Sequence, residues 1–214
     1  MSKPYTTAEF SAQITEDRYW RLREILDLKN AAVRSDPALR RVLLRSLVTI
    51  CYAHWEGYVR FAAQKYLEFV AIRKMQYQEL DPQFLRNYFL PRLGALVTSK
   101  GSVADRCALV DDILASFSRR FSRVNADLVN ARSNLNFEVY TDICRVCAVP
   151  DAAPEDKSQF VDVVLLKRRN AIAHGENTFI DLDDVDELTN ETVAIMRTFG
   201  DALENQVVLG KYKA

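Results

Sequence analysis

The chain has 214 residues, of which 49% are hydrophobic and 27% are charged, so it can bury a sizeable core and has the composition of an ordinary globular protein. Lysine plus arginine and aspartate plus glutamate each number 29. This balance argues against a protein that coats nucleic acid by bulk electrostatics, while leaving room for a local basic site. No apolar run reaches the roughly 18 residues that a membrane-spanning helix requires.

Two long helical patterns occupy the first third of the sequence. Thr6 or Thr7 can cap a helix that runs to about residue 30, with apolar residues at helical spacing. Ser35 and Asp36 then precede Pro37, a cap followed by proline at the first helical position. The second helix therefore begins at Pro37 and continues to about Lys74. Such a length favours a helix that is buried on more than one side or that reaches beyond its own domain to a partner.

Shorter elements follow in the middle of the chain. The pattern first predicts a short helix over 84–89, followed by loops at Pro91, Gly94 and 99–102. It then predicts a helix from Ser102 or Val103 to about Phe121 and another from Asn134 to Ala148. A loop over 149–154 follows.

The last third predicts two more helices. The first covers Ser158–His174 and ends at Gly175, a natural C′ residue, with Phe160, Val163, Val164, Leu166 and Ile172 facing inward. A short extended crossing over 178–181 precedes a helix from Val185 to about Val208, capped by Asp183 and Asp184. With only 6 Gly, 6 Pro and no internal repeat, we expect one all-α domain, a helical bundle over residues 1–214.

The cysteine pattern allows two interpretations. Cys144 and Cys147 form a C-x-x-C in an apolar helical run, but no second pair or nearby histidine completes a zinc set. We interpret them as buried structural thiols, with a metal or redox role as the alternative. The small number of cysteines and the absence of a signal peptide predict a reducing, cytoplasmic location.

Three polar residues crowd the end of the helix predicted over Ser158–His174. Asn170 and His174 are four positions apart and share a face. Arg169 lies about 140° round the helix from His174. A pocket that needs both would therefore lie at the helix end or across the seam of a dimer.

These residues carry a family resemblance. Arg169-Asn170, followed after three residues by His174, resembles the R-x4–6-H signature of HEPN domains. The stretch 53–60, with Trp55-Glu56-Gly57 at its centre, resembles the W-E-G helix segment of prokaryotic HEPN proteins of the RiboL-PSP-HEPN-like group. The resemblance implies an all-helical fold and a metal-independent endoribonuclease without cofactors. It also implies a homodimer with a composite active site, acting in toxin–antitoxin or antiviral defence with an antitoxin or defence-system partner.

The implied chemistry assigns a role to each motif residue. The partial negative charge at a helix end favours imidazolium and nearby Arg169 opposes it, so His174 can act as a general acid or base near neutral pH. Arg169 has the fork that binds phosphate oxygens, and Asn170 can orient either partner. The alternative is a histidine bonded to a helix carbonyl and an arginine in a surface ion pair.

Further residues have supporting roles in this hypothesis. Lys167 and Arg168 enlarge a positive rim for RNA. Glu56, in an apolar stretch, needs a basic partner such as Arg169 or Arg60. His54 is interpreted as structural, with a contact of its imidazole with the groove as the alternative. Arg119 and Arg120, beside Phe121, can bind a phosphate backbone and stack a base, or they can form an ordinary solvated helix end.

Two rival functions stay open at this point. One is a non-catalytic HEPN module that binds RNA, nucleotide or a protein partner, and the other is a purely structural helical dimer. The sequence shows no P-loop, Rossmann, H-E-x-x-H or G-x-S-x-G pattern, and its acidic residues form no obvious metal cluster. Two-metal nuclease chemistry is therefore disfavoured.

Overall fold

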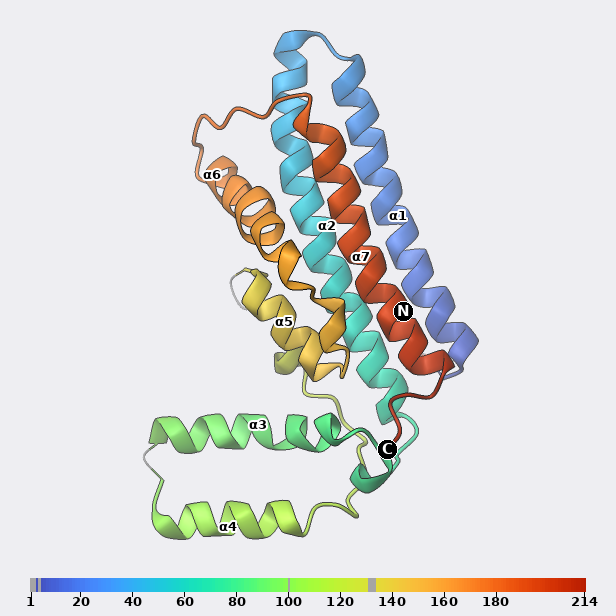
Figure 1. The fold of residues 1–214 in the computed structure, drawn as a ribbon, viewed down its shortest axis with the longest axis vertical. Helices are drawn as coiled ribbons and strands as arrows, with labels where there is room; N and C mark the ends of the chain where they lie inside the picture. The colour runs from blue at the N-terminus through green and yellow to red at the C-terminus, as the bar shows by residue number, and fades with distance from the viewer. Residues whose placement is uncertain (1–2, 4, 100, 131–133) are drawn as a thin grey trace.

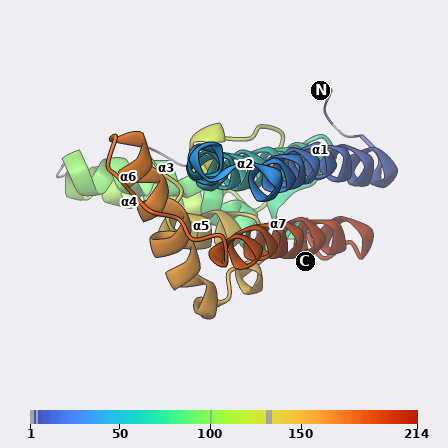
Figure 2. The same cartoon turned by 90° about the horizontal axis from the view of Figure 1, so that it is seen from above.

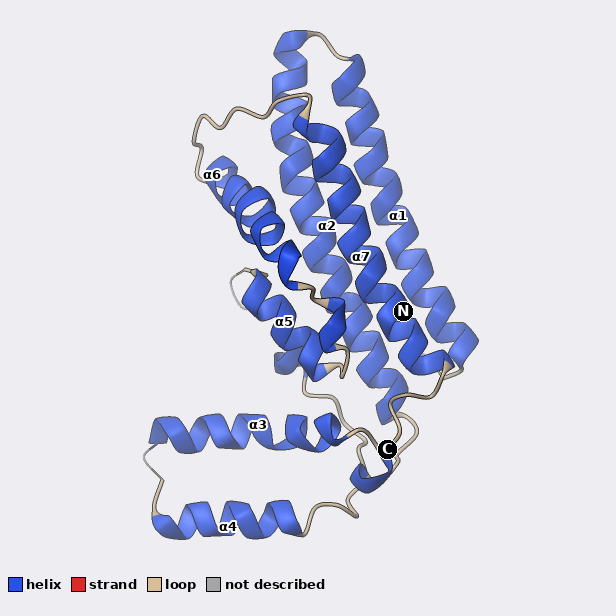
Figure 3. Cartoon of the chain, in the orientation of Figure 1, coloured by secondary structure: helices blue, strands red, loops and turns tan. Residues whose placement is uncertain are grey.

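The computed structural model describes residues 3, 5–99, 101–130 and 134–214, and 76% of this part of the chain is helical, with no strand (Figures 1 and 3). The prediction of an all-α fold is therefore confirmed. The longer helices are α1 (Thr7–Arg34), α2 (Pro37–Ala71), α3 (Pro82–Ser99), α4 (Val103–Leu114), α5 (Phe137–Val146), α6 (Arg168–Ala173) and α7 (Asp184–Val208). A π-helix, η5 (Phe160–Lys167), leads directly into α6, and four short 3-10 turns are η1 (Tyr77–Glu79), η2 (Ala126–Val129), η3 (Pro150–Ala152) and η4 (Glu155–Lys157).

Helix α2 is the centre of the bundle. It packs against both α1 and α7, and Figure 2 shows α7 on one side of the layer that α1 and α2 form. Its fully buried side chains point in several directions around the helix, among them Leu47, Cys51, Trp55, Tyr58 and Val59. These contacts confirm the expectation that so long a helix is buried on more than one side. The burial stabilises the bundle, because removing apolar surface from water is the main favourable term in folding.

Local capping signals set most helix starts in the bundle. Thr6 caps α1 in a capping box with Glu9, and the Asp36 carboxylate accepts from the amides of Ala38 and Leu39 ahead of α2. The predicted cap of α7 is only partly right. Asp183 makes no capping hydrogen bond because its backbone is already helical, whereas Asp184 lies in the first turn.

Helices α3 and α4 form a hairpin across the end of the bundle (Figure 1), and here the predicted boundaries are wrong. Helix α3 continues to Ser99 through Pro91 and Gly94, where loops were expected. A proline removes one backbone bond from a helix, and Pro91 sits on the exposed side of the hairpin. Lys100, within the expected 99–102 loop, lies outside the described residues.

Helix α4 ends at Leu114 instead of Phe121, because the following backbone pairs with another segment. The amides of Tyr77 and Gln78 donate to the carbonyls of Arg119 and Phe117, and the Phe121 amide donates to the carbonyl of Met75. These bonds between distant segments replace the helical bonds that residues 117–121 would otherwise make.

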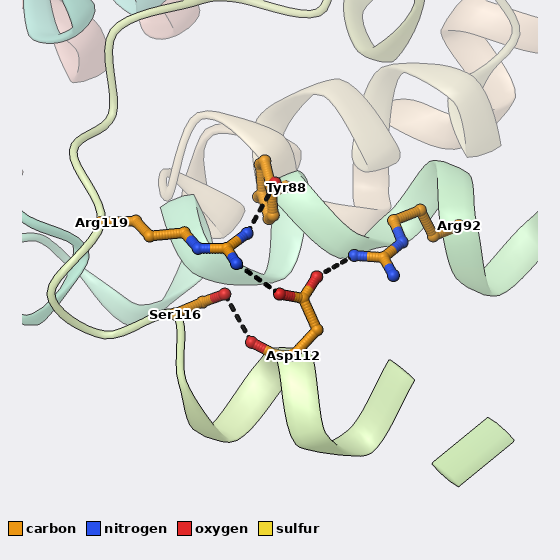
Figure 4. Close-up of polar contacts among 5 residues, drawn as sticks. All are labelled: Tyr88, Arg92, Asp112, Ser116 and Arg119. Atoms are coloured by element: carbon orange, nitrogen blue, oxygen red, sulfur yellow. Dashed lines mark hydrogen bonds and ion pairs between the residues drawn. The ribbon is translucent and has the colours of Figure 1, made fainter. Parts of the chain in front are cut away.

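A polar cluster holds this hairpin together (Figure 4). The Asp112 carboxylate on α4 accepts hydrogen bonds from Arg92 on α3 and, at 2.6 Å, from Nη2 of Arg119. Arg119 also donates to the Tyr88 hydroxyl at 3.1 Å, and the Ser116 hydroxyl donates to the backbone carbonyl of Asp112. The bond from Arg92 is the main reason why the pKa of Asp112 lies below its usual value.

The segment predicted as one helix over Ser158–His174 consists of η5 and α6 in succession. In the π-helix the backbone bonds span five residues instead of four, so Phe160 and Leu165, five apart, are both buried. Val163 was predicted to face inward but is 46% exposed, since the wider turn rotates it outward. A π-helix frequently marks a functional site, and this one ends two residues before Arg169.

The remaining elements adjust the prediction in smaller ways. Helix α5 begins at Phe137 with Asn136 as its cap and ends at Val146, so Asn134 precedes it. Cys144 and Cys147 are buried free thiols, and burial raises the pKa of Cys144 to about 12. None of the described helices combines the length and apolarity needed to cross a membrane.

Candidate functional site

His174 is presented at the end of α6 by a well-formed helix stop. Gly175 takes a left-handed conformation with φ of +80°, which glycine adopts without steric penalty. Its amide donates to the carbonyl of Ile172 at 3.1 Å, and the Glu176 amide donates to the carbonyl of Ala171 at 2.9 Å. These two bonds define a Schellman motif. The backbone of His174 is therefore fixed while its side chain is exposed.

The imidazole of His174 makes no hydrogen bond or ion pair to any residue that the structure describes. Only its backbone amide is engaged, donating to the carbonyl of Asn170 at 2.9 Å. The arrangement differs from the alternative in which the histidine side chain is bonded to a helix carbonyl. The side chain is accessible to a ligand from solvent.

Arg169 is held on the other side of α6, against α2. Its guanidinium carbon lies 3.9 Å from the centroid of the Tyr52 ring, and Nη2 donates to Oδ1 of Asn134 at 2.7 Å. Its Nε is buried and has no hydrogen-bond partner among the residues that the structure describes. Arg169 is thus a stacked, half-buried cation with unused donor capacity, and no described carboxylate lies within ion-pair distance of it.

Tyr52 links the arginine to the W-E-G stretch. Burial raises the pKa of Tyr52 to about 12, with the neighbouring Glu56 carboxylate acting in the same direction, so the hydroxyl stays neutral. Its oxygen accepts from the amide of Leu135 at 2.7 Å. Glu56 itself pairs with Arg60 at 3.8 Å, which confirms Arg60 as the predicted partner. The ring contact and the side-chain hydrogen bond of Arg169 go to Tyr52 and Asn134, whereas the ion pair of Glu56 is with Arg60.

The other members of the W-E-G stretch are structural. Trp55 is fully buried. A Cβ added to Gly57 would lie 2.5 Å from Nη1 of Arg21, so glycine lets α1 place an arginine against α2. His54 is buried, with Nε2 2.7 Å from the carboxylate of Glu24, and burial lowers its pKa. The interpretation of His54 as structural agrees with these contacts.

A groove of about 610 Å³ borders the segment that follows His174. It lies between the first half of α2 and this segment, and it was not anticipated from the sequence. Two arginines, Arg41 and Arg45, lie four positions apart on α2 and line it. The remaining lining residues are Val42, Ser46, Thr49, Ile50, Ile172, Gly175, Glu176 and Asn177.

The residues predicted to contact RNA do not all gather here. Arg168 pairs with Asp184 at 3.1 Å, which ties α6 to α7, whereas Lys167 is exposed. Arg119 belongs to the Asp112 cluster, and Arg120 donates to the carbonyl of Lys74. Figure 1 shows the α3–α4 hairpin, which carries the Asp112 cluster, well separated from the end of α6.

Phe121 cannot stack a base as expected, because its ring is buried against Phe84 and Tyr77. The described residues also contain no group of three or more His, Cys, Asp or Glu side chains placed to hold a metal ion.

An R-x4-H motif that ends one helix, packed on a long central helix with a W-E-G stretch, defines an all-helical protein of the HEPN class. The sequence model of the family described as RiboL-PSP-HEPN matches residues 16–205, so the chain belongs to this family. Searches of curated proteins and of solved structures gave no match. Membership in the family indicates a ribonuclease or another RNA-related activity.

Proposed function

We propose that this protein is a HEPN-type endoribonuclease that cleaves single-stranded RNA by attack of the substrate's own 2′-hydroxyl. The observation that supports this most is the exposed imidazole of His174, which has no partner among the described residues and stands at a well-formed helix end, five residues after an arginine that stacks on Tyr52. Together they supply the two groups that the reaction needs, one to move a proton and one to hold negative charge.

The proposed reaction is a transesterification at phosphorus. His174 takes the proton of the 2′-hydroxyl, the 2′-oxygen forms a bond to the adjacent phosphorus, and the bond from phosphorus to the 5′-oxygen breaks. A proton returned to that oxygen leaves a 5′-hydroxyl and a 2′,3′-cyclic phosphate. The Arg169 fork binds the phosphate oxygens as charge develops, and Asn170, on the His174 face, orients imidazole or phosphate.

The test is cleavage of a labelled single-stranded RNA in excess EDTA. We expect cleavage to continue, because proton transfer and charge stabilisation are both assigned to side chains. The products should carry a 2′,3′-cyclic phosphate, identified by mass spectrometry. DNA of the same sequence is the matched control and should survive, since it lacks the attacking hydroxyl. Full inhibition by EDTA or equal cleavage of DNA would refute the mechanism.

Arg169 and His174 diverge around α6, with Arg169 turned toward Tyr52 and His174 toward solvent. A two-fold axis can bring each motif beside its copy, so we propose a homodimer with a composite cleft. Sedimentation should show a dimer at micromolar concentration. A mixed dimer of a His174→Ala chain and an Arg169→Ala chain should regain activity, because Arg169 of the first chain and His174 of the second remain in the composite cleft. An active species that sediments only as monomer would contradict the composite site.

One observation favours a second candidate. Arg169 is already engaged by Tyr52 and Asn134, as it would be in a HEPN module that binds RNA, nucleotide or a protein without cleaving. Inactivity on varied RNAs would favour that module.

For the nuclease, we propose a cytoplasmic role in toxin–antitoxin or antiviral defence, with an antitoxin or defence-system partner. Residues 1–214 would carry out this role as one domain.

A further inference from the structure

We propose that the groove between α2 and the segment after His174 binds the phosphate backbone of single-stranded RNA that flanks the cleaved bond. Arg41 and Arg45 are the phosphate contacts. The inference rests on the proposed function, because it gives the strand a path that leads to His174. Neither arginine is part of the R-x4-H motif or the W-E-G stretch.

The charge on this part of α2 favours an anion. From Pro37 to Trp55 the helix carries no aspartate or glutamate, but it carries Arg40, Arg41 and Arg45. Arg40 donates to the carbonyls of Ala32, Val33 and Ser35, closing the turn between α1 and α2. Arg41 and Arg45 share one face, and like charges at this spacing repel each other. A phosphate placed between them would relieve that repulsion.

Both arginines keep donor capacity for a ligand. Nη1 of Arg45 donates to the carbonyls of Glu176 at 2.7 Å and Thr178 at 3.3 Å, and Arg41 donates to the side-chain oxygen of Asn177. A guanidinium has five N–H donors, so most of each fork is unused. Across the described residues, no carboxylate lies within ion-pair distance of either arginine. The acidic residue among those lining the groove is Glu176, whose side chain is exposed.

The position of the groove connects it to the proposed chemistry. Its wall includes Gly175, Glu176 and Asn177, the three residues that directly follow His174. An RNA strand lying in the groove would therefore run beside the segment that directly follows His174, although His174 itself does not line the groove. The aliphatic side chains of Val42, Ile50 and Ile172 line the same groove and can contact ribose and base faces. Because phosphate contacts carry no sequence information, this site should bind different sequences alike.

The test measures binding separately from cleavage. A fluorescent single-stranded RNA with 2′-O-methyl groups lacks the attacking hydroxyl, so its Kd can be measured by anisotropy over a range of salt concentrations. Each phosphate contact contributes about 0.7 to the slope of log K against log salt on single strands. We expect Arg41→Ala to lower the slope by about 0.7 and the Arg41→Ala/Arg45→Ala double variant by about 1.4. Glu176→Gln should bind more tightly.

The matched control removes the same charge elsewhere. Arg23→Ala/Arg197→Ala alters two exposed arginines on α1 and α7 and should keep the wild-type slope. Because Arg45 also anchors the segment after His174, Arg45→Ala can disturb that segment. Arg45→Lys keeps the positive charge, so it should retain most of the wild-type salt slope that Arg45→Ala loses.

The outcomes separate this inference from the proposed function. The proposed RNA contact in the groove is overturned if Arg41→Ala keeps the wild-type salt slope. It is also overturned if the groove variants and the control variant lower that slope equally, and both conclusions hold even if RNA is cleaved. Conversion of the groove variants from dimer to monomer would identify an interface between copies and also overturn it. A wild-type protein that binds the oligonucleotide but cleaves no RNA refutes only the nuclease. One that neither binds nor cleaves refutes both.

Discussion

Replacing His174 with alanine is expected to lower the rate of RNA cleavage by at least about 10²-fold, the lower end of what a positioned general acid or base contributes. The fold should survive, because the side chain is exposed and makes no hydrogen bond to any residue that the structure describes. Single-turnover rates on a labelled RNA in EDTA, together with thermal melting, measure the two effects separately. Added imidazole should restore part of the rate, since solvent reaches the site.

His54, the other histidine in the sequence, offers the matched control. It is buried beside Glu24 and Trp20, so His54→Gln should lower the melting temperature while the folded fraction cleaves RNA at close to the wild-type rate. An active His174→Ala protein would overturn the assignment of the proton-transfer group. The same conclusion would follow if His54→Gln alone removed activity from a fully folded protein.

Replacing Arg169 with alanine is expected to lower cleavage by about 10²–10³-fold, the loss seen when one stabilising donor is removed from a developing charge. Arg169→Lys should recover only part of this, because a point charge replaces a fork that binds two phosphate oxygens. The rate constant of the chemical step is the quantity to measure, with Kd determined on the 2′-O-methyl RNA.

The neighbouring Arg168 is the matched control for charge. It pairs with Asp184, so Arg168→Ala should change cleavage only a few-fold while weakening the contact between α6 and α7. Asn134→Ala tests positioning, because it frees Nη2 of Arg169 without removing the cation. Equal losses in Arg168→Ala and Arg169→Ala would contradict a specific role for Arg169.

The parts of the fold that were predicted correctly are those with local causes. The caps at Thr6 and Asp36 and the stop at Gly175 depend on residues within one helical turn, so the sequence displays them directly. The end of α4 depends on backbone bonds between 117–121 and 75–78, which local pattern cannot reveal. The π-helix before Arg169 likewise has more residues per turn than an α-helix, and the prediction that Val163 faces inward assumed the α-helical period.

The candidate site divides in the same way. Arg169, Asn170 and His174 are recognisable from their spacing on one helix. The Tyr52 ring and the Asn134 amide that hold Arg169 come from segments more than 30 residues away in the sequence, and nothing in their own surroundings marks them. Arg41 and Arg45 show a weak signal, a pair of cations in an acid-free stretch, but only the packed structure places them beside the residues that follow His174.

The anchorage of the segment after His174 has a consequence for how this protein can change over time. Arg45 holds that segment through the backbone carbonyls of Glu176 and Thr178, and not through their side chains. Every amino acid supplies a carbonyl, so substitutions at 176 and 178 leave these two bonds available. The wall of the groove can therefore vary in side-chain chemistry, and with it in the ligands it favours, while the path of the chain past His174 stays the same.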